Sequence, residues 1–259
     1  MTERSAGDSP IDRALAALHD AIRAEIRAEQ LRDRLTGLAS LEALDAWLES
    51  KTSEGAAFWV AFLEVDKFKS INDEFGYEHA NSYLLRVGEE LRHAAGSFFG
   101  PGTVPFRAHG DEFYLAGRSN GLQDEDIAGA LELTAANIAA SKLSVRLGQT
   151  AKVMHGTVST GWLQSVDARE AEAGLTVQAV KQYLEIAVER AKQNRGSIVR
   201  WEASFERLDT AHGRADCSSC ETKFELRLKL ARRAVTPLYC PHCGERVDRP
   251  PALLPPADN

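Results

Sequence analysis

Hydrophobic residues near the N-terminus recur every three or four positions, which is the spacing of one face of a helix. Asp8-Ser9-Pro10 places a capping residue before a proline, a common start of a helix. We therefore predict an amphipathic helix from this point, with Arg and Glu opposite its apolar face. Such a helix suits dimerisation or docking, and packing against its own domain is an equal alternative. The apolar positions are Ile11, Leu15, Leu18, Ile22 and Ile26.

The middle of the chain alternates strand-like and helix-like patterns. Residues 57–65 form a long apolar run, which predicts a buried central strand. Residues 103–106 and 113–116 are β-favouring runs on either side of a polar, Gly-containing tip, so they predict a β-hairpin. Strands interleaved with helices on this scale predict an α/β or α+β fold, a sheet with helices on its faces. The other expected elements are helices over 40–50, 83–91, 123–141 and 177–192, and strands over 153–162 and 197–201.

Carboxylates stand where these expected strands end. Glu64 and Asp66 close the central strand, and Asp111 and Glu112 follow Gly110 at the hairpin tip. An unpaired charge is costly to bury, so acids at the end of a buried strand indicate a site more often than a core. Carboxylates next to a glycine that permits close backbone approach suit a divalent cation carrying phosphate. The alternative at the tip is a solvated turn, since Asp and Gly are ordinary turn residues.

Composition narrows the function classes. The 259 residues include 44% hydrophobic and 27% charged side chains, as in an ordinary globular protein. The net charge of −7 gives the whole chain no electrostatic case for nonspecific binding to nucleic acid. No apolar run approaches the roughly 20 residues that span a bilayer, and residues 1–10 lack the apolar core of a secretory signal. We expect a cytoplasmic protein with no membrane partner.

The four cysteines form two C-x-x-C pairs with 19 residues between them. Two such turns present four thiolates to one tetrahedral Zn²⁺, which predicts a zinc ribbon with a structural metal ion. A redox-active dithiol or free thiols are the alternative. Basic residues between the pairs leave nucleic-acid contact open, and a protein-docking or dimerising role is at least as consistent with them. The predicted zinc ligands are Cys217, Cys220, Cys240 and Cys243.

Several short motifs follow one another along the chain. They are DRLTGL at 33–38, VDKFKSIND at 65–73 with Phe75-Gly76 after it, HGDEF at 109–113, VSTG at 158–161, and Ala187 followed by Ala191-Lys192. Together these motifs resemble the GGDEF family, the diguanylate cyclases, over residues 33–201. No single motif decides the match, and it is their order and spacing that carry the resemblance.

The resemblance implies a palm-like sheet on which each subunit binds one GTP with two Mg²⁺ ions. Two subunits would face each other as a homodimer, so that each 3′-hydroxyl attacks the partner's α-phosphate and gives cyclic di-GMP and pyrophosphate. The resemblance also implies three sets of site residues. The metal set is Glu64, Val65, Asp111 and Glu112, the catalytic set is Asp111, Glu112 and Lys192, and the substrate-binding set is Phe68, Lys69, Asn72, Asn81, His109, Gly110 and Arg195.

The chain departs from the family at several of these positions. Glu64 replaces an Asp and reaches one methylene further, and His109 replaces a Gly at a point where a side chain must share space with the phosphates. Asn81 replaces an Asp, and its amide offers guanine one acceptor and a donor, so another purine triphosphate is the alternative substrate. The remaining differences are Tyr77 for a His, Arg195-Gly196 for Gly-Arg, Ser40-Leu41 for Asn-Arg, and no Arg-x-x-Asp product-inhibition site at 99–103.

Two functions therefore stay open. One is a diguanylate cyclase-like enzyme with altered geometry and without product feedback. The other is a degenerate GGDEF module that binds nucleotide or a protein partner and signals without catalysis. The carboxylates favour the first, because acids brought together without a cation repel one another, and the altered pocket favours the second. The expected domains are a disordered tip and amphipathic helix at 1–32, a cyclase-like domain at 33–203, a zinc ribbon at 204–249 and a disordered tail at 250–259.

Overall fold

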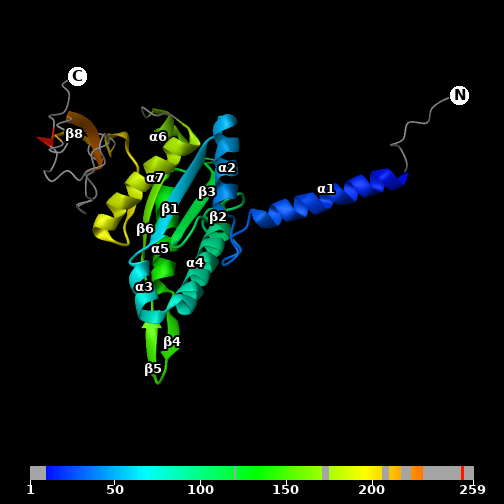
Figure 1. The fold of residues 1–259 in the computed structure, drawn as a ribbon, viewed down its shortest axis with the longest axis horizontal. Helices are drawn as coiled ribbons and strands as arrows, with labels where there is room; N and C mark the ends of the chain where they lie inside the picture. Colours follow the sequence, from blue (N-terminus) through cyan, green and yellow to red (C-terminus); the bar gives the residue numbers. More distant parts are fainter. Residues whose placement is uncertain are drawn as a thin grey trace.

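The structure is a computed structural model, and it describes residues 10–119, 121–170, 175–205, 210–216, 223–229 and 252–253. Figure 1 shows one central sheet with helices on both of its faces, and a long N-terminal helix that extends away from it. Within the described ranges, no helix combines the length and the apolar character needed to cross a bilayer.

Five strands form the main sheet, in the order β2-β3-β1-β6-β7. The predicted central strand is β1, which pairs antiparallel with β3 on one side and with β6 on the other. The predicted hairpin is β2 with β3, and β7 joins β6 in parallel. This mixed sheet with its flanking helices confirms the predicted α/β class. The strands are β1 (Phe58–Val65), β2 (Val104–Arg107), β3 (Glu112–Arg118), β6 (Val158–Gln164) and β7 (Ile198–Arg200).

The helices divide between the two faces of the sheet. Side chains of α3, α4 and α5 pack on one face, and side chains of α2 and α7 pack on the other. The four helices predicted in the middle of the chain are present as α2, α4, α5 and α7. The helices are α1 (Pro10–Gln30), α2 (Leu41–Ser53), α3 (Phe68–Phe75), α4 (Tyr77–Ser97), α5 (Asp124–Ala140), α6 (Ser165–Glu170), α7 (Val177–Ala191) and the 3₁₀ helix η1 (Lys192–Asn194).

The alternation of side chains along β1 explains its unbroken apolar run. Trp59 and Leu63 pack with α3, α4 and α5, whereas Phe58 and Val60 pack with α2 and α7, and all four are fully buried. Successive strand residues point to opposite faces, so a strand covered on both sides needs apolar residues at every position. The same alternation places Glu64, near the end of the strand, on the face that α7 covers.

The structure corrects the strand predicted over 153–162. The chain forms β5 (Thr150–Met154), leaves the extended conformation at 155–157, and begins β6 only at Val158. β5 pairs with β4 (Leu143–Leu147) in a separate two-stranded hairpin, which the sequence patterns did not predict. The hydroxyl of Tyr83 on α4 donates to the carbonyl of Gly156 at 3.0 Å. The break between the two strands is therefore held by a buried residue of a distant helix. The alternation of apolar and polar residues around the break cannot reveal such a contact.

Helix α3 is a second element that the sequence patterns did not predict. It precedes α4 directly, and the two helices are separated by Gly76. This residue has φ 82°, in the left-handed region that favours glycine, so it ends one helix and lets the next begin at a new angle.

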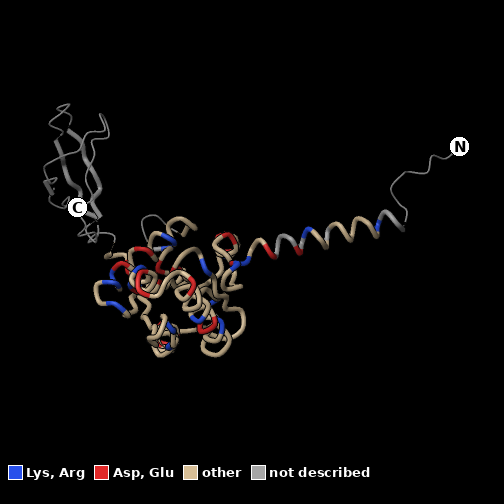
Figure 2. The backbone as a smooth tube through the Cα atoms, turned by 60° about the horizontal axis from the view of Figure 1, so that its bottom comes forward, with Lys and Arg blue, Asp and Glu red and all other residues tan. Residues whose placement is uncertain are grey.

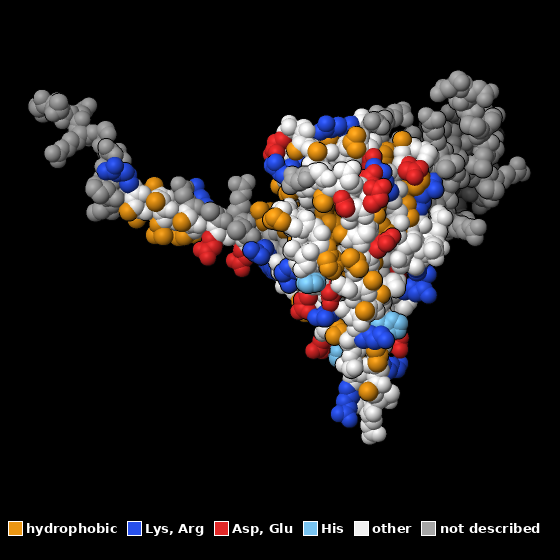
Figure 3. Space-filling view, turned by 180° about the vertical axis from the view of Figure 1, so that it is seen from behind, with side chains coloured by type: hydrophobic (Ala, Val, Ile, Leu, Met, Phe, Trp, Pro, Cys, Tyr) orange, Lys and Arg blue, Asp and Glu red, His pale blue; other side chains and the backbone are white. Residues whose placement is uncertain are grey.

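Helix α1 confirms the predicted N-terminal helix and its start at Pro10. Figure 2 shows it leaving the body of the domain, with charged residues along its length. Leu15, Leu18 and Ile22 are 54%, 56% and 44% exposed, so these side chains do not pack against their own domain. Figure 3 shows hydrophobic side chains gathered along one side of this helix. Dimerisation or docking through that side stays a prediction.

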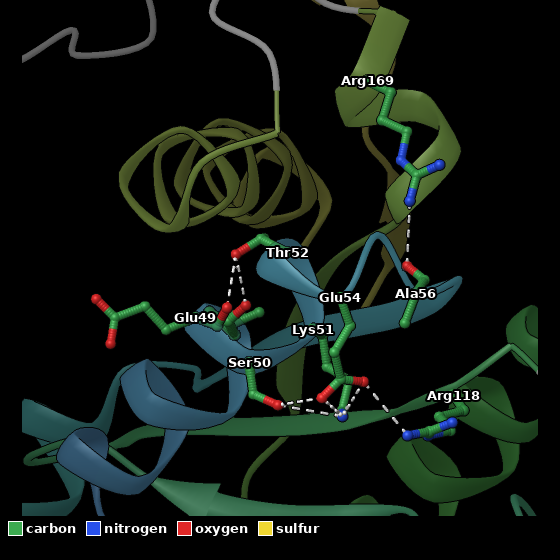
Figure 4. Close-up of polar contacts among 9 residues, drawn as sticks. Glu49, Ser50, Lys51, Thr52, Glu54, Ala56, Arg118 and Arg169 are labelled. Atoms are coloured by element: carbon green, nitrogen blue, oxygen red, sulfur yellow. Dashed lines mark hydrogen bonds and ion pairs between the residues drawn. The ribbon is translucent and has the colours of Figure 1, made fainter.

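A cluster of polar contacts fixes the turn between α2 and β1 (Figure 4). Lys51 Nζ lies 2.9 Å from Glu54 Oε2, and Arg118 at the end of β3 approaches the same carboxylate at 3.5 Å. Arg169 of α6 donates to the carbonyl of Ala56 at 3.3 Å. Contacts from α2, β3 and α6 therefore meet where β1 begins.

The C-terminal part of the chain contains a three-stranded sheet in the order β10-β8-β9. Within it, β9 covers Phe224, Leu226 and Leu228, which alternate with polar residues in the sequence as is typical of a strand. The four cysteines lie outside the described residues, so the zinc ribbon stays a prediction. The strands are β8 (Thr210–Asp216), β9 (Lys223–Lys229) and β10 (Ala252–Leu253).

Candidate functional site

Acids at the ends of β1 and β3 come together at one edge of the sheet. Glu64 lies opposite Glu112 in the register of the two strands, and the backbone N of Val65 donates to the carbonyl of Asp111 at 3.1 Å. Glu64 and Glu112 share the face that α7 covers, because strand neighbours in register point the same way. We call Glu64, Asp111 and Glu112 the acidic row. The structure thus brings together three residues predicted to hold metal, while their binding of metal stays a prediction.

The acidic row is electrostatically strained. Burial raises the pKa of each of its three carboxyl groups. Repulsion adds to this rise for Glu64, which faces Asp111 and Glu189, and for Glu112, which faces the other two acids of the row. A positive charge brought to the row relieves both effects, so the arrangement favours cations.

The hairpin tip holds Asp111 in a tight turn. The backbone N of Glu112 donates to the carbonyl of His109, and that of Ala108 donates to the carbonyl of Glu112, both at 3.0 Å. Gly110 has φ 54°, which an L side chain rarely adopts, so this position requires glycine for the turn. His109 is 72% exposed, and its Nε2 lies 3.2 Å from Glu112 Oε2. The imidazole therefore contacts the acidic row from the open side of the tip.

Arg107 ties the tip to the segment that follows α1. Its Nε and Nη2 donate to the carbonyl of Gly110 at 3.1 and 2.7 Å, and its Nη1 donates to both carboxylate oxygens of Asp33 at 3.0 and 2.9 Å. Asp33 also accepts from the backbone N and the hydroxyl of Thr36. Burial alone would raise the pKa of Asp33, but these hydrogen bonds outweigh it and lower the pKa. Arg107 was not among the predicted site residues, although its place three residues before Gly110 was an available signal.

Lys192 reaches the acidic row from the end of α7. Its Nζ lies 2.5 Å from Glu64 Oε2 and 3.0 Å from Glu189 Oε1. Burial would lower the pKa of Lys192, but the hydrogen bonds to both carboxylates outweigh it and raise the pKa, so the ammonium stays charged. Lys192 was among the predicted residues, whereas Glu189 was not. The signal for Glu189 was its spacing of three from Lys192, which puts the two side chains on one face of a helix turn.

Arg195, the second predicted phosphate-binding cation, contacts a different acid. Its Nε lies 4.0 Å from Asp66 Oδ1, and its side chain is 53% exposed. Asp66 is 5% exposed and accepts from the hydroxyls of Thr157 and Ser159 at 2.6 and 2.7 Å. Asp66 and Arg195 line a cavity of about 570 Å³ between α3 and the break that precedes β6. The structure thus places Lys192 and Arg195 against separate carboxylates.

The residues predicted to hold the base lie on α3 and α4. Phe68 is 9% exposed and belongs to the hydrophobic core, so little of its ring is open to a ligand. Lys69 is exposed and Asn72 is half-buried on the same helix, and Asn81 is exposed near the start of α4. These three side chains have polar groups at the surface, where a ligand can reach them.

The donor set of the acidic row suits Mg²⁺. Among the residues that the structure describes, no three His, Cys, Asp or Glu side chains already converge as a metal-binding cluster. Glu64, a carboxylate that a metal ion would share, is paired with the Lys192 ammonium instead. The row nevertheless offers carboxylate oxygens from two adjacent strands, the ligands that Mg²⁺ prefers. Glu64, Asp111 and Glu112 are therefore the residues that would hold this ion.

Known proteins are similar to the chain over the segment that contains this site. A family model described as "Diguanylate cyclase, GGDEF domain" matches residues 30–197. A segment of 101 residues is 33% identical to "Diguanylate cyclase DgcP" of Escherichia coli (strain K12), covering 38% of this chain and 28% of that protein. A segment of 106 residues is 29% identical to "Cyclic di-GMP phosphodiesterase PdeB" of Shewanella oneidensis, covering 39% of this chain and 12% of that protein. The chain thus matches less than a third of the length of either relative.

A solved structure has the same fold. The GGDEF domain of DgcB from Caulobacter crescentus, solved in complex with c-di-GMP, aligns with a TM-score of 0.56 and 22% sequence identity, over 66% of this chain and 93% of that chain. This likeness supports the fold alone. The relatives by sequence carry the names of a cyclase and of a phosphodiesterase, so the choice of activity depends on the residues of the site.

Proposed function

Because the chain belongs to the GGDEF family, we propose that it is a diguanylate cyclase-like enzyme that condenses two GTP to cyclic di-GMP and pyrophosphate. The observation that carries this proposal is the acidic row, in which Glu64 faces Glu112 across two paired strands with Asp111 beside them. Acids in this arrangement repel one another, and a cation that carries a triphosphate relieves the repulsion.

The proposed reaction joins two nucleotides by phosphoryl transfer. Each 3′-hydroxyl forms a P–O bond to the α-phosphorus of the other GTP, the bond to the β-phosphate oxygen breaks, and pyrophosphate leaves with the electron pair. Mg²⁺, when bound, stabilises the negative charge that develops on the transferring phosphoryl group. Glu64, Asp111 and Glu112 hold the ion in place, and the turn at Gly110 lets the backbone approach the phosphates. Lys192 supplies a positive charge for the terminal phosphates.

One chain holds one nucleotide in this proposal, so the reaction needs two chains face to face. The exposed apolar side chains Leu15, Leu18 and Ile22 support dimerisation through α1, because an apolar helix face of this kind is buried when two helices pair. The proposed partners of the domain are therefore a second copy and GTP.

The base preference is proposed to be guanine, with a second purine as the alternative. Asn72 and Asn81 both offer amide groups, each with an acceptor oxygen and a donor nitrogen. An amide at position 81 accepts one hydrogen bond from guanine and can instead donate to an adenine ring nitrogen, so ATP is the competing substrate to test.

A second candidate function is a non-catalytic GGDEF module that binds nucleotide or a protein partner. Two contacts favour it: Lys192 holds Glu64, and His109 holds Glu112, so two carboxylates of the row are engaged by side chains of the chain itself. A domain whose acids are already in contact with its own side chains can bind a nucleotide without aligning it for transfer.

Incubation of the purified chain with GTP, ATP or both, with Mg²⁺, followed by chromatography of the products, tests the enzyme proposal. We expect GTP alone to give cyclic di-GMP, and a mixed product from the two nucleotides would indicate the altered purine preference. Cys217→Ser serves as the control, because a change in the predicted zinc ribbon should leave the product in place. If no nucleotide gives product, the enzyme proposal is wrong, and a rise in melting temperature with GTP would support the second candidate.

The four cysteines are proposed to bind one structural Zn²⁺ in a ribbon that docks a protein partner. The paired C-x-x-C spacing supports this, since it presents two thiolates from each of two turns. We expect metal analysis of the purified chain to find about one zinc per chain, and about none in a Cys217→Ser/Cys240→Ser variant. A chain that carries no zinc and forms a disulfide instead would contradict the ribbon.

A further inference from the structure

Lys192 is shared between two carboxylates that lie on different elements. Glu64 belongs to the acidic row at the end of β1, whereas Glu189 lies three residues earlier on α7, the helix that leads into Lys192. Their oxygens are 2.5 and 3.0 Å from Nζ, so the ammonium contacts both carboxylates at once. Glu189 is 40% exposed and outside the row. The same ammonium can therefore stay on Glu189 without touching the row.

A divalent cation at the row must compete with this ammonium for Glu64. Two cations in contact with one carboxylate repel each other strongly at such short range. The cation therefore binds to all three acids of the row most tightly when Lys192 has moved off Glu64. This movement costs less free energy when Lys192 also pairs with Glu189, because Lys192 then keeps one of its two ion pairs.

The position of Glu189 suits this role. Residues three apart along a helix are neighbours on its surface, so Glu189 and Lys192 lie side by side where α7 ends. Its charge also faces the row closely enough to raise the pKa of Glu64, after the larger effect of burial. The charge of Glu189 thus affects the pKa of Glu64, although Glu189 lies on α7 and is not one of the three acids of the row.

We propose that Glu189 is a positioning residue that draws Lys192 away from Glu64 and thereby opens the acidic row to a divalent cation. The inference rests on the proposed function, in which that cation carries the triphosphate. On this proposal, the affinity of the row for a divalent cation depends on the competition of Glu64 and Glu189 for Lys192. Glu189 itself touches neither the metal ion nor the nucleotide.

The test measures Mn²⁺ binding to the full chain without nucleotide, by the loss of the electron paramagnetic resonance signal of free Mn²⁺. Mn²⁺ prefers the same oxygen ligands as Mg²⁺, and the binding that Asp111→Asn removes defines the row. We expect Glu189→Gln to weaken this binding at least about tenfold, the lower end of the effects seen for residues that orient metal ligands. Glu185→Gln is the matched control, because it removes the same charge from an exposed position one turn earlier on α7. Its effect should stay below about twofold, as for a screened surface charge.

A double-mutant cycle separates the effect of Lys192 from a general effect of charge. Lys192→Met should tighten Mn²⁺ binding, since it removes the competing ammonium. In that background Glu189→Gln should weaken binding no more than Glu185→Gln does. The inference is overturned if the wild-type row binds no Mn²⁺, if the two glutamate variants behave alike with Lys192 present, or if the effect of Glu189→Gln persists without Lys192.

The assay of cyclic di-GMP formation from GTP and the Mn²⁺-binding measurements give independent results. Loss of Mn²⁺ affinity in Glu189→Gln, with no cyclic dinucleotide from any variant, would overturn the proposed enzyme and uphold the inference. Cyclic di-GMP formation, together with equal Mn²⁺ affinity in Glu189→Gln and Glu185→Gln, would support the proposed enzyme and overturn the inference. Melting temperatures without metal provide the structural control, and they should agree among wild type, Glu189→Gln and Glu185→Gln.

Discussion

Replacing Asp111 by Asn should abolish cyclic dinucleotide formation while leaving the fold intact. The loss should be about a thousandfold or more, which corresponds to the ~4 kcal/mol expected when a metal-held phosphoryl group loses a carboxylate from its site. Asn has the shape of Asp, and the hydrogen bond from Val65 to position 111 uses the backbone carbonyl, so the turn is kept. Product formation from GTP, measured by chromatography, checks the activity.

The same variant should not be less stable than the wild type. Asp111 adds to the repulsion felt by Glu64 and Glu112, so the removal of its charge relieves the row. Thermal unfolding should therefore occur at the same temperature or higher. Glu185→Gln, which removes a charge from the exposed side of α7, should keep both activity and stability. An Asp111→Asn variant that retains product would place the chemistry elsewhere and remove the main support for the cyclase proposal.

Replacing Gly161 by Ala should destabilise the domain by about 3 kcal/mol or more, the upper range for overpacking a core. Gly161 lies on β6, and an added Cβ would be 2.4 Å from the backbone N of Val188 and 2.8 Å from the carbonyl oxygen of Leu184. Both atoms belong to the backbone of α7, which cannot rotate aside as a side chain can. The helix must move off the sheet, and Lys192 at its end must move with it. Chemical denaturation followed by tryptophan fluorescence measures the stability.

A matched alanine substitution controls for the loss of glycine flexibility. Gly129 lies within α5, and an added Cβ there would meet no atom within 4 Å. Gly129→Ala should leave stability unchanged or raise it by up to about 1 kcal/mol, because Ala favours a helix more than Gly does. If Gly161→Ala were as stable as Gly129→Ala, α7 would not be held against β6 as closely as the structure places it.

The elements that could be predicted from the sequence are those that local patterns determine. β1 has apolar residues on both faces, and the hairpin has β-favouring runs around a glycine, so each was recognisable without its neighbours. The acidic row was predictable in outline for the same reason, because its acids stand at the ends of two predicted strands. Its register, with Glu64 opposite Glu112, required the structure.

The features that could not be predicted depend on contacts between distant segments. The break at 155–157 is tied to Tyr83, a residue of another helix, so the strand pattern around it gave no warning. The contact of Arg195 with Asp66 likewise depends on the path of the chain after η1 and could not be read from local patterns, while binding of phosphate by Arg195 stays a prediction. Glu189 was missed because an acid on a helix surface is common, and its importance comes from the lysine that it shares.

Arg107 determines where this domain can be cut or recombined. The Arg107 side chain is 10% exposed, and its guanidinium divides its hydrogen bonds between Asp33 and the carbonyl of Gly110. In a chimera that replaces α1 by a helix of another protein, Arg107 can still link Asp33 to the hairpin tip only if the junction precedes Asp33. A junction after Thr36 would leave the guanidinium buried without its counter-ion. The functional boundary of the domain therefore lies more than twenty residues upstream of the sheet itself, in a stretch that an engineer would otherwise treat as a replaceable linker.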